Sequence, residues 1–143
     1  FQKKYPIAQN AVQLQQGTVM DLYPTILSVA HVKPPKHYAL DGADLKKLFQ
    51  GKEDKKHRDD FLMHFPHGEH RANYFTTYRK GDWKLIYYYH PETTGIPTWK
   101  LYNLKDDPYE KTEVSAEYPE KTASMIEQMK DRLKEENALY PEE

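Results

Sequence analysis

The 143-residue sequence has no cysteine, no long hydrophobic run and no excess of charge of one sign. The absence of cysteine excludes disulfides, zinc–thiolate sites and thiol catalysis. No apolar stretch approaches the ~20 residues that span a bilayer. The net charge is −1 and basic residues alternate with acidic ones, so the one-sided basic surface that nucleic acid requires is missing. We therefore expect neither a nucleic-acid nor a membrane partner.

The sequence also lacks the motifs of nucleophilic and phosphate-binding chemistry. It contains no G-x-S-x-G segment and no glycine-rich phosphate loop. Twelve Tyr, five Phe and two Trp, with 38% hydrophobic and 30% charged residues, are nevertheless typical of a folded domain. On chemistry alone the chain resembles part of a larger active protein.

Helical signals dominate the first third of the chain. In DLYPTILSVAHV, Asp21 can cap a helix and Pro24 falls in the first turn, where it removes no intrahelical bond. An apolar face recurs at helical spacing, formed by Tyr23, Ile26, Leu27 and Ala30. A second short helical turn follows, with Gly51 placed to end it and with a face formed by Leu45, Leu48 and Phe49.

The centre of the chain is predicted to be β. FLMHF reads as a strand that ends at Pro66 or lies at a sheet edge. The segment 73–90 reads as two strands joined by a hairpin at Lys80-Gly81, and WKLYNL as a further strand. Pro119 then opens an amphipathic helix with the stripe Ile126, Met129 and Leu133, Met125 beside it. The expected fold is α+β: a small antiparallel sheet packed against a C-terminal amphipathic helix, preceded by a helical segment.

A histidine cluster in HFPHGEH is the strongest candidate for a binding site. His64, His67 and His70, with Glu69, have a spacing at which imidazoles can converge on a metal. Such sites use that spacing on helices, and Pro66 argues against a helix here, so we expect no metal site in this chain. The rim of a ligand site and a polar surface loop remain open as interpretations.

Two other groups of residues are candidates for a functional site. Carboxylates lie only in charge runs and turns, and none forms the pair of distinct environments that acid–base catalysis needs; they are Asp59, Asp60, Asp106, Asp107 and Glu110. The aromatic side chains of the hairpin could stack on sugar rings, but a half-buried sheet also favours them; they are Tyr74, Tyr78, Tyr87, Tyr88, Tyr89 and Trp99.

Three segments in sequence resemble the C-terminal region of the formylglycine-dependent, arylsulfatase-like sulfatases. DLYPTILSVA followed by DGADLKKLFQG is similar to the pattern D-x-x-P-T-[IL]-L, then D-G-x-x-L-x-x-L-x-x-G. HFPH followed by YRKGDWKLIYYY resembles H-[FY]-P-H and R-x-G-D-[WY]-K-L-I. KLYNLKDDPYEKTEV resembles L-Y-N-L-x-x-D-P-x-E-x-x-N-L. The chain departs from the family where His31 replaces a usual Gly and where Glu113-Val114 replaces Asn-Leu.

The resemblance implies a sulfatase that hydrolyses sulfate esters of carbohydrates. It implies that residues 1–60 are the tail end of a large α/β domain and residues 61–143 a C-terminal subdomain. The formylglycine nucleophile and a calcium ion are expected in the missing N-terminal domain, so no catalytic residue or cofactor lies in this chain. His64 and His67 fall on the segment expected to approach the substrate pocket and bind the sugar or sulfate.

Further expectations follow from this resemblance. The isolated chain should be inactive, its partners being a sulfated small molecule or glycan and the missing domain. Its exposed first helix favours self-association, and the family implies a periplasmic or secreted location. Two alternatives remain: a stand-alone carbohydrate-binding module that uses the tyrosine-rich sheet, and a structural interaction domain without a ligand. Neither the substrate nor the sulfate position can be read from these residues.

Overall fold

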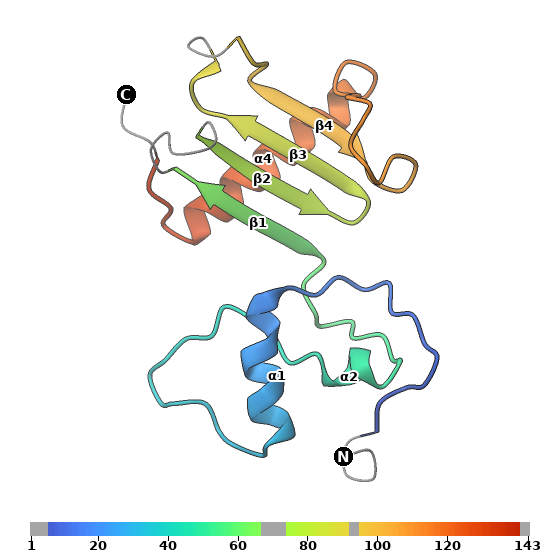
Figure 1. Cartoon of the computed structure of the whole chain (residues 1–143). Helices are drawn as coiled ribbons and strands as arrows, with labels where there is room; N and C mark the ends of the chain where they lie inside the picture. Colours follow the sequence, from blue (N-terminus) through green and yellow to red (C-terminus); the bar gives the residue numbers. More distant parts are fainter. Residues whose placement is uncertain (1–5, 67–73, 92–94, 141–143) are drawn as a thin grey trace. The chain divides into compact units, whose positions relative to one another are not determined.

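The chain forms two compact units, Phe1–Asp59 and Asp60–Glu143, each described here by itself. The structure, a computed structural model, describes residues 6–66, 74–91 and 95–140 (Figure 1). Within these ranges no helix has the length and apolar character needed to cross a membrane.

The main helix of the first unit is short and ends on a left-handed residue. The 3-10 turn η1 (Val19–Asp21) runs into α1 (Leu22–Val29), with Pro24 in its first turn as expected. His31 follows with φ 58°, and the N–H of Val32 donates back to the carbonyl of Leu27 at 2.9 Å. This is the position of the usual Gly in the resembled pattern, and a left-handed residue is where glycine is favoured.

Asp21 does not cap α1 through its side chain, so that prediction was wrong. Its carboxylate instead accepts the N–H of Thr18 at 2.6 Å and the N–H of Ala43, 22 residues away, at 2.7 Å. Thr25 continues the link, since its hydroxyl donates to the Asp21 carbonyl at 2.6 Å and accepts the N–H of Leu45 at 2.9 Å. We call these contacts the Asp21 clasp. The clasp joins α1 to the loop that precedes α2.

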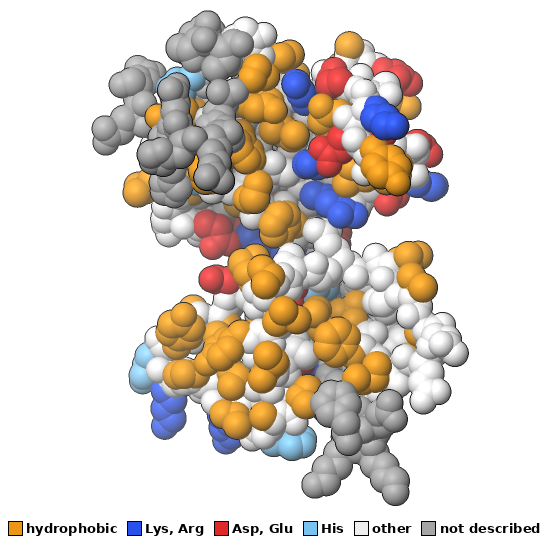
Figure 2. Space-filling view, viewed as in Figure 1, with side chains coloured by type: hydrophobic (Ala, Val, Ile, Leu, Met, Phe, Trp, Pro, Cys, Tyr) orange, Lys and Arg blue, Asp and Glu red, His pale blue; other side chains and the backbone are white. Residues whose placement is uncertain are grey.

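The second helix, α2 (Lys46–Phe49), is a single turn as expected. Gly51 ends it with φ 74°, its N–H donating to the Leu48 carbonyl at 2.9 Å. Leu45 and Leu48 are the only buried hydrophobic side chains among the described residues of this unit. Figure 2 shows many apolar side chains on its visible surface, and the exposed set includes Val19, Leu22, Tyr23, Ile26, Val32 and Phe49.

The second unit contains a four-stranded antiparallel sheet whose strands follow one another in chain order. They are β1 (Asp60–Phe65), β2 (Phe75–Lys80), β3 (Trp83–Tyr88) and β4 (Trp99–Asn103). The predicted hairpin is confirmed: Lys80 pairs with Trp83, and Gly81 has φ 56°. β1 is an edge strand and ends immediately before Pro66, because proline cannot donate to a strand ladder.

The helix α4 (Pro119–Glu135) lies across one face of this sheet (Figure 1). Pro119 is its first residue, as predicted. The buried stripe differs from the expected one, because Met125 is 2% exposed whereas Ile126 is only partly buried. Three strand residues and three helix residues form the core: Tyr78, Leu85, Leu101, Met125, Met129 and Leu133. Full burial of each aliphatic side chain contributes about 1.5–3 kcal/mol, so this unit has a real core of its own.

Candidate functional site

His64, the described member of the predicted histidine pair, has both ring nitrogens bonded. It lies on β1 opposite Thr76 of β2. Its Nδ1 is 2.7 Å from the Thr76 hydroxyl, and its Nε2 is 2.6 Å from the carbonyl oxygen of Leu139. A carbonyl can only accept, so Nε2 carries the hydrogen and donates it. His64 therefore fastens the segment after α4 to the edge strand.

The hydrogen-bonded chain continues from His64 into the sheet. Thr76 is fully buried, and its hydroxyl is 2.6 Å from the hydroxyl of Tyr89. Burial raises the pKa of Tyr89, and the nearby Tyr140 and Tyr87 add to this although the Thr76 bond opposes it. A neutral chain in which Tyr89 donates to Thr76 and Thr76 donates to His64 satisfies every group. A ligand can reach a ring nitrogen of His64 only by displacing Thr76 or Leu139.

The other members of the cluster, Glu69, His67 and His70, lie outside the described residues. The structure thus places one of the two predicted substrate-binding histidines. His64 stands at the end of β1, directly before the segment that carries the other.

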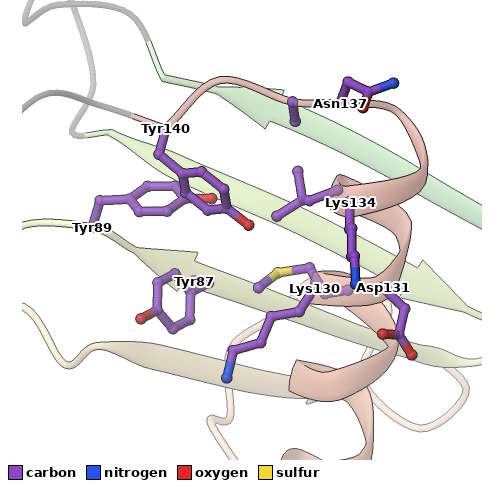
Figure 3. Close-up of a pocket in the computed structure, with 10 residues that line it drawn as sticks. Tyr87, Tyr89, Lys130, Asp131, Lys134, Asn137 and Tyr140 are labelled. Carbon is purple, nitrogen blue, oxygen red and sulfur yellow. The ribbon is translucent and has the colours of Figure 1, made fainter.

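A groove opens beside this hydrogen-bonded chain, with a volume of about 680 Å³. One wall consists of Tyr87 and Tyr89 at the end of β3, and Tyr140 closes it from the C-terminal segment (Figure 3). The opposite rim is the last two turns of α4, with Lys130 and Lys134. The remaining lining residues are Met129, Asp131, Leu133, Asn137 and Ala138.

The aromatic side chains considered as a possible sugar platform do not form a single surface. Tyr87 and Tyr89 line the groove, whereas Tyr78 is 1% exposed in the core. Tyr88 points to the opposite face because side chains alternate along a strand, and Lys100 lies over its ring. The groove instead gains Tyr140, which sequence reasoning missed because it follows the last predicted element.

Four of the five candidate carboxylates have structural partners, as the sequence interpretation favoured. Asp60 lies 3.4 Å from the Arg132 guanidinium, which also bonds Glu136 at 2.8 Å. Asp107 accepts the N–H of Thr112, and Asp106 accepts from the Asn103 side chain. Glu110 pairs with Lys84 at 2.6 Å. None of these four carboxylates lines either of the two grooves found among the described residues.

The described residues do not fit the metal and nucleophile that the resemblance implies. They contain no group of three or more His, Asp or Glu side chains arranged to hold a metal ion. The chain has no cysteine from which formylglycine could form. No catalytic step is therefore assigned to residues of this chain.

Comparisons with known proteins agree with the resemblance to sulfatases. A family profile described as N-sulphoglucosamine sulphohydrolase, C-terminal, matches residues 1–138. An uncharacterized sulfatase of Schizosaccharomyces pombe is 33% identical over 138 residues, which are 87% of this chain and 23% of that protein. Human N-acetylgalactosamine-6-sulfatase is 35% identical over 75 residues, 49% of this chain and 14% of that protein. The chain thus spans a quarter or less of these relatives.

Solved structures show the same fold. The structure of BT4656 in complex with its substrate D-glucosamine-2-N,6-O-disulfate matches with a TM-score of 0.62 and 28% identity. The match covers 80% of this chain and 23% of that one. A putative sulfatase from Bacteroides thetaiotaomicron matches with a TM-score of 0.65 at 21% identity, over 80% of this chain and 24% of that one.

Proposed function

Because the chain belongs to the N-sulphoglucosamine sulphohydrolase C-terminal family, we propose that it is the C-terminal part of a sulfatase acting on sulfated carbohydrates. The observation that carries the proposal is the family match over residues 1–138. The printed substrate of the BT4656 structure, a sulfated glucosamine, supports the class of substrate. In this proposal the chain shapes the substrate pocket, while formylglycine and calcium belong to a large N-terminal domain.

The first unit supports the existence of such a domain. Its described residues bury only two hydrophobic side chains, Leu45 and Leu48, which is little for a unit of this size. Beside α1 lies an apolar groove of about 350 Å³, lined by Ile7, Leu22, Thr25, Ile26, Val29, Ala30 and Phe49. An apolar surface of this kind marks an interface. We propose that residues 1–60 complete the large domain and that residues 61–143 form the C-terminal subdomain.

The same surface gives the isolated chain a property that can be measured. Ile26 is 63% exposed and Leu22 46%. With no partner domain, this face should drive self-association that rises with protein concentration. Light scattering should find dimers or larger species, and Ile26→Glu should restore the monomer, whereas Lys36→Glu, at an exposed site, should not. A parent chain that stays monomeric would contradict a docking role for α1.

His64 and His67 are the proposed substrate-facing residues of the second unit. An imidazolium beside a sulfate would be favoured by the opposite charge. For His64 this requires that its bond to Thr76 or to Leu139 opens when the ligand binds. In the full-length enzyme, His67→Ala should raise KM for a sulfated sugar with little change in stability. His64→Ala should also lower stability, because the Leu139 carbonyl loses its donor. His37→Ala, an exposed histidine elsewhere, serves as the control.

Activity of the isolated chain tests the central proposal. With sulfated glucosamine or an aryl sulfate as substrate, the 143-residue chain should release no sulfate, with or without calcium. The coding sequence ahead of Phe1 should contain a C-x-P-S-R-like or S-x-P-S-R-like motif. Reproducible metal-dependent turnover by the chain, or the absence of that motif, would refute the proposal.

A second function, that of a stand-alone carbohydrate-binding module, is favoured only by the tyrosine-lined groove. The exposed apolar face of the first unit speaks against a module that stands alone. Glycan binding by the isolated chain, together with a strictly monomeric state, would favour this alternative.

A further inference from the structure

We propose that the groove between β3 and the end of α4 binds an anionic sugar residue of the glycan. The site is formed by Tyr87, Tyr89 and Tyr140, with Lys134 of α4 on its rim. The inference rests on the proposed function for the class of glycan. It adds a binding site that is separate from sulfate-ester chemistry.

The three tyrosines form a continuous aromatic wall. Tyr87 and Tyr89 have ring centroids 5.3 Å apart at 69°, and Tyr89 and Tyr140 are 5.9 Å apart at 76°. Both contacts are edge to face, so these rings are not stacked on one another. Part of the face of each ring is therefore available to a sugar. Tyr140 is 55% exposed. The C–H face of a pyranose ring is apolar and packs on such a surface, while its hydroxyls reach phenolic oxygens.

The groove has a size and a floor suited to one or two sugar rings. Its volume of about 680 Å³ lies within the range of small-molecule sites. Met129 and Leu133, each almost fully buried, form an apolar floor below the aromatic wall. Asn137 at the rim supplies an amide that can exchange hydrogen bonds with sugar hydroxyls.

The charges at the rim select an anionic sugar. Lys134 has no ion-pair partner among the described residues, whereas Lys130 contacts Glu127 at 3.1 Å on the exposed surface. Figure 3 shows Lys130 extending toward Tyr87, and the carboxylate of Asp131 pointing away from the three rings. The Lys134 ammonium on the helix rim, without an ion-pair partner in the described part of the chain, would attract a sulfated or carboxylated sugar bound on the tyrosine wall.

The groove is also joined to the predicted substrate-facing segment. Tyr89 bonds Thr76, Thr76 bonds His64, and His64 holds Leu139 next to Tyr140. The ring of His64 lies 6.1 Å from that of Tyr140, edge to face. A glycan whose end is bound near the His64 segment could therefore extend along the tyrosine wall.

Direct binding by the 143-residue chain tests the site, with a heparin tetrasaccharide as probe and its chemically desulfated form as comparison. Calorimetry should show binding of the sulfated form that weakens as salt increases. We expect Tyr140→Ala to weaken binding about tenfold and Lys134→Ala about threefold at physiological salt. Tyr109→Ala and Lys105→Ala, exposed residues away from the groove, should bind as the parent does.

The outcomes separate this inference from the proposed function. No binding, equal binding of the desulfated form, or parent-like affinity of both groove variants would overturn the inference and leave the sulfatase assignment intact. Sulfate release by the isolated chain would overturn the proposed function without affecting the groove. Circular dichroism shows whether each variant is folded. If Tyr140→Ala is not folded, the affinity of Lys134→Ala alone tests the inference. That variant should fold, because it changes only an exposed side chain on a helix that tolerates alanine.

Discussion

The hydroxyl of Thr25 in α1 accepts the backbone N–H of Leu45, 20 residues later, at 2.9 Å. Both groups are buried, so the bond fixes the loop before α2 against the helix. The Asp21 carboxylate and the Thr25 hydroxyl thus explain why the pattern D-x-x-P-T has Asp and Thr at these two positions. These residues hold the backbone in place.

Asp21→Asn should destabilise the first unit by about 1–3 kcal/mol, because an amide can replace only one of the two accepting oxygens. Amide hydrogen exchange at Ala43 and Leu45 measures this locally. Asp41→Asn, at an exposed carboxylate in the following loop, should leave exchange unchanged. Equal protection in Asp21→Asn and the parent would contradict the clasp.

Acid should remove the contribution of Asp21. Burial by itself would raise the pKa of this carboxyl, but the hydrogen bonds from Ala43 and Thr18 outweigh burial and the pKa lies below its ordinary value of 3.8. Because the pKa of Asp21 is lower in the folded state than in the unfolded state, its carboxylate stabilises the fold at pH values above 3.8. This contribution is lost as the pH falls through the lower pKa of the folded state. The difference in protection between the parent and Asp21→Asn should therefore shrink below about pH 4.

Gly42→Ala should be strongly destabilising. A Cβ at this position would lie 2.1 Å from the carbonyl oxygen of Met20 and 2.7 Å from the nitrogen of Asp21, both backbone atoms. We expect a loss of about 3 kcal/mol or more in the same exchange experiment. Gly17→Ala is the matched control, since its methyl would meet only side-chain atoms at ordinary contact distances, Leu45 at 3.4 Å and the Asp21 carboxylate at 4.0 Å. Comparable protection in the two variants would rule out a tight approach at Gly42.

His31→Gly should stabilise the first unit by about 0.5–1 kcal/mol, because residue 31 has φ 58° and glycine avoids the Cβ strain there. Ala30→Gly is the control. Its φ is −78°, so glycine gains nothing and should destabilise by up to ~1 kcal/mol. Exchange of the α1 amides distinguishes the two. If His31→Gly destabilises the first unit, the contacts of the imidazole stabilise it by more than the Cβ strain at residue 31 costs.

Glu113→Ala should destabilise the second unit by about 1–2 kcal/mol. The carboxylate accepts the N–H of Leu101 on the outer strand β4 at 2.9 Å and the N–H of Ser115 at 2.7 Å. Urea unfolding followed by the fluorescence of Trp83 and Trp99 reports on this unit. Glu113→Gln keeps an accepting oxygen and should lose much less. Equal losses in the two variants would assign the effect to charge.

Local chemistry made much of this fold predictable. Gly81 at the hairpin, Pro66 after the edge strand and Pro119 at the start of α4 each act within a few residues, and each prediction is confirmed. The resemblance to sulfatase C-terminal regions is also confirmed by the family match. The antiparallel sheet with its C-terminal helix follows from the same signals.

What could not be predicted depends on contacts between distant residues. Aspartate before a helix is typical of a helix cap, but the carboxylate of Asp21 binds Ala43, which lies in another loop. Met125 and Ile126 are neighbours in sequence, and only the position of the sheet decides which one is buried. His64 meets Leu139 across 75 residues, so neither that bond nor the tyrosine groove leaves a local pattern.

The order of the strands has a consequence for folding. Each strand pairs with the one before it in the chain, so the sheet assembles as a meander with short loops to close. In this unit α4 and the segment after it contact residues far away in sequence, as His64 and Leu139 do across 75 residues. The sheet can therefore nucleate early, with the hairpin of β2 and β3 at its centre, and the tyrosine groove is completed last.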